Sequence, residues 1–196
     1  MIVGYHIIFG MYGFWLPNDP RASWSDFVGS WDLFRYGPAT KTTERRSLAN
    51  RAHDHALRKA AKKALEYPAV VLNGQQARAV ALGFAAYFST SDCPVWACAI
   101  LPDHVHLVVG RPDMDVEQLA IQLKGAATES LKEASLHPFG DIKDHRGRTP
   151  KCFARGEWKV FLDPPDVPRA VTYVEDNPDK EGKPRQRWTF VVPYEG

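Results

Sequence analysis

The alternation of apolar and polar residues along the chain predicts a regular succession of strands and helices. Runs of β-branched and aromatic residues indicate strands, and apolar residues three or four positions apart indicate helices. The expected strands cover 2–16, 69–73, 95–101, 104–110 and 157–162, and the expected helices cover 51–66, 75–89, 115–135 and 163–178. The succession of strand, helix, two adjacent strands, helix, strand and helix is typical of an α+β fold, and it matches a ferredoxin-like antiparallel sheet with helices on one face.

Two of the predicted helices carry recognisable end signals. Asp115 and Gln118 have the spacing of a capping box at the start of the helix over 115–135. The last helix begins in a proline-rich first turn, where proline is tolerated, and we expect Pro178 to stop it.

The length of 196 residues predicts one domain over 1–196. Within it, residues 17–50 combine several prolines and glycines with the aromatic residues Trp24, Phe27, Trp31 and Phe34, which indicates an irregular, aromatic-rich insertion. Residues 179–196 form a C-terminal tail that ends in the apolar sequence WTFVVPY. We expect this tail to pack on the sheet or on its edge.

Composition excludes several classes of protein. Hydrophobic residues make up 44% of the chain and charged residues 24%, which is typical of a globular protein and not of a disordered or fibrous one. No apolar run approaches the roughly 18 residues of a membrane span, and the N-terminus lacks a secretory pattern. The three cysteines have no paired metal-ligand spacing. A cytoplasmic protein with no membrane partner is therefore expected.

The distribution of charge is more informative than its sum. The formal net charge is only +2, but residues 41–63 hold eight basic and two acidic groups, 143–159 hold six and two, and 180–188 hold four and one. Basic segments interleaved with aromatic residues suit a polyanion, because they offer charge to phosphates and flat faces to bases. Solvated helix faces and ordinary loop charges would explain the same pattern.

Two histidines on one predicted strand are candidates for a metal site. His104 and His106 are two residues apart, so their side chains leave the same face of the sheet. Val105, Leu107 and Val109 leave the other face, which should be the core side. Two imidazoles on one face can bind a divalent cation, although at least one further ligand must come from elsewhere. The alternative is an exposed pair without a ligand. The other five histidines, His6 among them, show no spacing that indicates a metal ligand.

The last helix carries a second set of polar candidates. Arg169, Tyr173 and Asn177 are four residues apart in succession, so they share one face. A tyrosine hydroxyl can attack phosphorus, an Asn carbonyl oxygen suits Mg²⁺ or Mn²⁺, and a guanidinium suits a phosphate. A packed tyrosine with its hydroxyl at the rim is the structural alternative.

Taken together, these segments resemble a known family. The sequence HVHLVV, the amphipathic helix after it, the basic strand, and the helix ending in YVEDNP resemble the single-tyrosine HUH transposases of the IS200-like fold, and most of all the REP-associated tyrosine transposases. His104-Val105-His106 corresponds to the His-hydrophobic-His motif. Tyr173, Asn177 and Pro178 correspond to the family's Tyr-x-x-x-Asn-Pro segment. The resemblance covers roughly 70–180, with 1–16 as the first strand.

The resemblance implies a metal-dependent enzyme that cleaves and rejoins single-stranded DNA. The His-hydrophobic-His motif would lie on a central strand, and the catalytic tyrosine would lie on the C-terminal helix. Tyr173 would form a 5′-phosphotyrosine link, and His104, His106 and Asn177 would hold Mg²⁺ or Mn²⁺. The DNA would be a hairpin or another single-stranded element. Candidate DNA contacts, from this resemblance and from the charge pattern, are Arg169, Lys124, Gln122, Arg155, Lys159, Arg185 and Arg187.

Three questions stay open from the sequence. A domain that binds DNA hairpins without cleaving them, or a metal phosphodiesterase acting on small nucleotides, would share some of these features. The chain could act as a monomer or as a homodimer, because relatives present the tyrosine either to their own histidines or to a partner's. No dedicated base for the tyrosine proton is evident.

Overall fold

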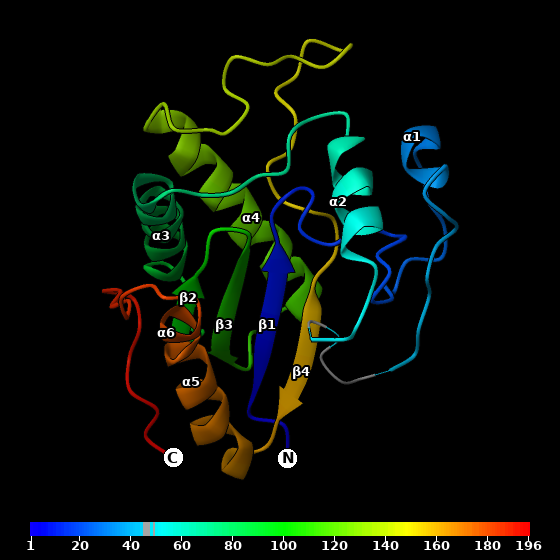
Figure 1. Ribbon diagram of the computed structural model, residues 1–196. Coiled ribbons are helices and arrows are strands. Elements are labelled where there is room, and N and C mark those ends of the chain that lie inside the picture. Colours follow the sequence, from blue (N-terminus) through cyan, green and yellow to red (C-terminus); the bar gives the residue numbers. More distant parts are fainter. Residues whose placement is uncertain (45–47, 49) are drawn as a thin grey trace. The chain divides into compact units, whose positions relative to one another are not determined.

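A four-stranded antiparallel sheet in the order β2-β3-β1-β4 forms the centre of the computed structural model, which describes residues 1–44, 48 and 50–196 (Figure 1). The strands are β1 (Gly4–Gly10), β2 (Val95–Ile100), β3 (His104–Gly110) and β4 (Trp158–Leu162). With helices α3 (Gly74–Phe88) and α4 (Val116–Glu133) they give the order β1, α3, β2, β3, α4, β4. This is the β-α-β-β-α-β order of ferredoxin-like folds, so the predicted α+β class is confirmed.

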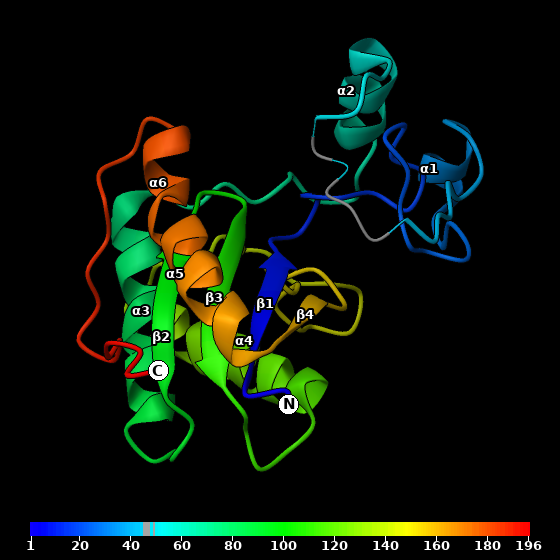
Figure 2. The ribbon, with the colours of Figure 1, turned by 90° about the horizontal axis from the view of Figure 1, so that it is seen from below.

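Helices cover both faces of this sheet, and not one face as the sequence pattern suggested (Figure 2). Phe9 of β1 meets Phe84 of α3 with ring centroids 6.2 Å apart, so α3 packs on the face to which the odd-numbered residues of β1 point. On the opposite face, Val108 of β3 shares a core with Val167 and Val174 of α5 (Val167–Glu175). The second apolar face has to be covered, and the short helix α5 covers it.

The segment predicted as one helix over 163–178 consists of three pieces. A 3₁₀ turn over Pro164–Asp166 leads into α5, and a further turn, α6 (Asn177–Lys180), follows directly. Pro178 lies in the first turn of α6 and does not stop the helix. Proline is tolerated there because the first amides of a helix have no intrahelical acceptor.

Three other local predictions differ from the structure. The first strand ends at Gly10, not at residue 16, because its partner β3 begins at the opposing His104. Residues 69–73 form no strand. Asp115 makes no side-chain cap, whereas Asn73 and Gln76 form a reciprocal capping box at the start of α3.

The C-terminal tail packs along the outer edge of β2, as expected. Gln186 accepts a hydrogen bond from the amide of Ile100 and donates one to its carbonyl, at 2.7 and 2.8 Å. Val191 forms an isolated parallel bridge with Val95, and Tyr194 packs edge-on against Trp96. The tail thus occupies backbone groups of a strand edge that could otherwise pair with another chain.

The sheet, α3 to α6 and the tail form one compact unit, Met1–Met11 with Val71–Gly196, and Tyr12–Val70 form a second. The second unit contains α1 (Trp31–Phe34), α2 (His55–Lys63) and the described part of the predicted insertion over 17–50, of which residues 45–47 and 49 lie outside the described residues. Its core includes Leu16, Leu33 and Ala61. Among the described residues, no helix is long and apolar enough to cross a membrane.

Candidate metal and tyrosine site

The two histidines of β3 share one face of the sheet, as their spacing predicts. The ring centroids of His104 and His106 are 4.8 Å apart. His106 is buried, with 4% of its surface exposed, whereas His104 lies near the end of the strand and is partly accessible. Val105, Leu107 and Val109 are fully buried on the other face, which confirms that it faces a core. The pair therefore lies inside the protein, on the face that α5 covers.

A third histidine, His6 of β1, completes the group. Antiparallel pairing of β1 with β3 sets His6 opposite Val108, on the same face as His106. The Nε2 atom of His6 lies 2.9 Å from Nδ1 of His106, which is hydrogen-bond distance. Sequence reasoning missed His6, because 100 residues separate the two partners and only the strand register brings them together.

Burial favours the neutral form of His6 and His106. Desolvation lowers the pKa of His6 to about 4. The pKa of His106 is also lowered, chiefly by burial and further because His104, His6 and Lys180 lie close enough to disfavour a second positive charge. Neutral imidazole is the form that ligates a metal ion.

Asp103 contacts His104 as His6 contacts His106, through the Nδ1 atom of the ring. The Nδ1 atom of His104 lies 2.8 Å from Oδ1 of Asp103. Each histidine of β3 is thus held through its Nδ1 atom, so a metal ion would bind through Nε2. A carboxylate or another acceptor on the remote ring nitrogen is the usual support of a metal-bound histidine. The donor set therefore fits a divalent cation.

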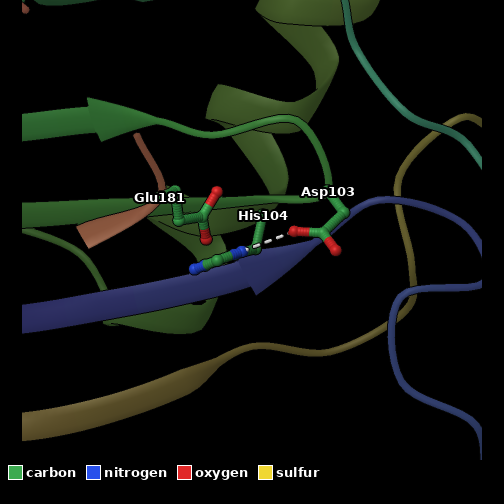
Figure 3. A group of neighbouring side chains, drawn as sticks. All are labelled: Asp103, His104 and Glu181. Carbon is green, nitrogen blue, oxygen red and sulfur yellow. Dashed lines mark hydrogen bonds and ion pairs between the residues drawn. The ribbon is translucent and has the colours of Figure 1, made fainter. Parts of the chain in front are cut away.

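A carboxylate from the end of α6 adds an oxygen donor to this set. Figure 3 shows the imidazole of His104 between the carboxylates of Asp103 and Glu181. One ligand atom from each of these three residues lies within 4.8 Å of the others. Glu181 directly follows α6 and was not among the residues predicted from sequence.

Tyr173 stands beside the histidines and is accessible from outside. Its ring centroid lies 5.7 Å from that of His6 and 5.7 Å from that of His106, edge-on in both cases. The residue is 44% exposed and borders a shallow hollow that Pro168, Arg169, Thr172 and Asp176 also line. The ammonium group of Lys180 lies 4.3 Å from the Tyr173 ring centroid. Lys180 is a further neighbour that sequence reasoning missed.

The predicted Arg-Tyr-Asn face is only partly shared. Arg169 and Tyr173 line the same hollow, and Arg169 is ion-paired with Asp166. Asn177 is buried, with 8% exposed, and its Nδ2 donates to the Tyr173 carbonyl at 2.8 Å. Because the side-chain nitrogen is engaged within its own turn, the carbonyl oxygen is the atom that Asn177 would offer to a cation.

The remaining predicted DNA contacts are spread over the sheet-containing unit. Lys124 of α4 lies over the Phe9 ring and pairs with Glu157. Lys159 of β4 pairs with Glu117 of α4. Both lysines therefore belong to the face of the sheet opposite the histidines. Gln122 is exposed on α4. Arg185 pairs with Asp176 and Asp179, near α5, whereas Arg155 and Arg187 are exposed. Arg169 and Arg185 are thus placed at or beside the Tyr173 helix by their ion pairs.

Comparison with known proteins gives similarities at low sequence identity. No family model and no curated protein matches the chain. One solved structure, a REP-associated tyrosine transposase bound to a REP hairpin, is similar with a TM-score of 0.47 and 13% identity, over 96% of this chain and 74% of the other. A crystal structure of a candidate transposase from Deinococcus radiodurans R1 is similar with a TM-score of 0.38 and 12% identity, over 90% of this chain and 91% of the other.

Proposed function

We propose that the chain is a metal-dependent enzyme that cleaves and rejoins single-stranded DNA, with Tyr173 as the nucleophile. The observation that carries this proposal is the position of a half-exposed tyrosine ring 5.7 Å from a buried histidine of a His-x-His pair. In this proposal Tyr173, which is accessible to solvent, would be the nucleophile for phosphorus, and the neighbouring histidines would be cation ligands. A purely structural tyrosine has no need of a histidine pair in which each ring is held through its Nδ1 atom.

The residues that would hold the ion are His104 and His106, each through Nε2, with Asn177 or Glu181 supplying oxygen. A bound Mg²⁺ or Mn²⁺ would polarise the phosphate oxygens and orient the phosphorus for in-line attack. A mixed imidazole and carboxylate set suits Mn²⁺ better than Mg²⁺, which prefers oxygen ligands and water. We therefore expect stronger binding of Mn²⁺.

The bonds that form and break in the covalent step belong to Tyr173 and the DNA. The Tyr173 oxygen forms a bond to phosphorus as the bond from phosphorus to the 3′-oxygen breaks. The tyrosine loses its proton, and the 3′-oxygen gains one and leaves as a hydroxyl. The phosphodiester energy is kept in the 5′-phosphotyrosine, so attack by a 3′-hydroxyl reverses the step and rejoins strands. Lys180, above the Tyr173 ring, attracts the phenolate as it forms.

The DNA itself would approach from the hollow beside Tyr173. Arg169 lines that hollow and Arg185 lies near α5, so both are candidates for the phosphates that flank the scissile one. We propose a hairpin or another structured single strand as the substrate, because a formal charge of +2 is too small for strong indiscriminate binding to duplex DNA. Tyr173 meets His106 of its own chain, an arrangement that a monomer could use.

A covalent-adduct assay tests the proposal. Labelled single-stranded hairpin DNA is incubated with Mn²⁺ and the protein, and the products are separated on a denaturing gel. We expect an adduct with the parent protein and with Tyr87→Phe, a tyrosine on α3 on the opposite face of the sheet, but none with Tyr173→Phe. Chelator or His104→Ala should abolish it as well.

Each other result assigns a different function. Hairpin binding without any adduct would indicate a binding domain that does not cleave. Turnover of mononucleotide or cyclic substrates alone would indicate a phosphodiesterase. An adduct that persists in Tyr173→Phe would remove this residue as the nucleophile.

A further inference from the structure

We propose that His6 is a positioning residue of the metal site, which fixes the ring of His106 so that its Nε2 atom carries a lone pair for the cation. This inference rests on the proposed metal site, but not on DNA cleavage. It starts from the 2.9 Å separation between Nε2 of His6 and Nδ1 of His106, between two residues that are 8% and 4% exposed.

Which of the two histidines donates the shared proton decides whether His106 can bind a metal ion. Two neutral imidazoles that meet nitrogen to nitrogen share one proton between those atoms. If His6 donates it, the second proton of the pair sits on Nε2 of His106, which then cannot bind a metal ion. If His106 donates it, Nε2 of His106 carries a lone pair. Metal binding therefore requires His6 to act as the acceptor, and His6 acts on the cation through His106.

Packing holds His6 in the position for this role. His6 lies in the middle of β1, paired with Val108 of β3 on one side and Val160 of β4 on the other. Its ring is inclined by 30° to that of His106, with ring centroids 5.1 Å apart, and Tyr173 meets both rings edge-on. Strands β3 and β4 pair with the backbone of His6, and His106 and Tyr173 contact its ring. Because His6 is held in this way, it restricts the rotation of the His106 ring.

The same pattern on the neighbouring histidine gives this interpretation a parallel within the site. Asp103 accepts from Nδ1 of His104, and His6 would accept from Nδ1 of His106. One ligand is thus supported by a carboxylate and the other by an imidazole. A direct ligand role for Nε2 of His6 conflicts with this geometry, because that atom is already in contact with Nδ1 of His106.

Manganese binding by the whole chain without DNA tests the proposal. Free Mn²⁺ is followed by its electron paramagnetic resonance signal during titration of the protein. His6→Phe keeps a flat ring without an acceptor and should weaken Mn²⁺ binding roughly 10- to 100-fold, the usual effect of losing such a partner. His6→Gln supplies an acceptor oxygen and should restore most of the affinity. His145→Gln, at an exposed loop position, is the matched control and should bind as the parent does.

The tautomer of His106 is the second measurement, and it needs only the parent protein. Long-range ¹H–¹⁵N correlation spectra should show the proton on Nδ1 in the absence of metal. Unchanged Mn²⁺ affinity in His6→Phe, equal losses in His6→Phe and His6→Gln, or a proton on Nε2 of His106 in the parent would each overturn the proposal. If DNA cleavage fails while these readouts hold, only the proposed function falls.

Discussion

Removal of the positive charge above Tyr173 should slow formation of the covalent adduct without preventing it. Lys180→Met keeps the length of the side chain and deletes an ammonium group 4.3 Å from the ring centroid. With the phenolate charge taken as spread over the ring, Coulomb's law at 4.3 Å gives about 1 kcal/mol in water and about 4 kcal/mol at the effective dielectric of a protein surface. Tyr173 is 44% exposed, so solvent screening favours the lower end.

A stabilisation of about 1–2 kcal/mol that acts on the forming phenolate corresponds to a roughly 5- to 30-fold loss of rate. The assay is a single-turnover measurement of adduct formation at saturating labelled DNA, so that weaker DNA binding does not enter the rate. Lys183→Met removes the same charge three residues later, at an exposed position, and Lys180→Arg keeps the charge. Equal rates in Lys180→Met and Lys183→Met would refute the role of Lys180.

Three further outcomes follow from individual contacts. Asp103→Asn should weaken Mn²⁺ binding roughly 10- to 100-fold, measured by the same resonance titration, because it removes the carboxylate that holds His104. Arg21→Met should destabilise the unit Tyr12–Val70 by about 3–5 kcal/mol in chemical unfolding, because it leaves the fully buried Asp19 charge without its bidentate partner. Burial opposes ionisation of Asp19, but Arg21 and Arg58 outweigh it and lower its pKa, so the pair's stabilisation should be complete near neutrality and disappear as the pH falls below about 4. Gln186→Leu should cost about 1–3 kcal/mol, seen as a lower unfolding midpoint, because two hydrogen bonds to the backbone of Ile100 are lost.

The parts of the fold that depend on nearest neighbours could be predicted from the sequence. The strand over His104–Gly110 and the helices α3 and α4 appear close to their expected positions, because the periods of 2 and 3.6 residues are local properties. The same-face placement of His104 and His106 follows from the strand period alone. The C-terminal end of β1 could not be predicted from the sequence. It is set by the first residue of its antiparallel partner β3, which lies far along the chain.

The composition of the site depended on the tertiary structure. Sequence spacing indicated the His104 and His106 pair and the helical succession of Tyr173 and Asn177. The register of β1 against β3 placed His6 on His106, and the packing of α5 on the histidine face placed Tyr173 beside both rings. The turn after α5 added Lys180 and Glu181.

The sequence by itself thus determined which chemical groups the chain carries and which local faces they share, since each is fixed by backbone periodicity. Only the tertiary structure decided which of those faces meet. Strand register and helix docking join residues far apart in the chain, through contacts that no spacing between neighbours encodes.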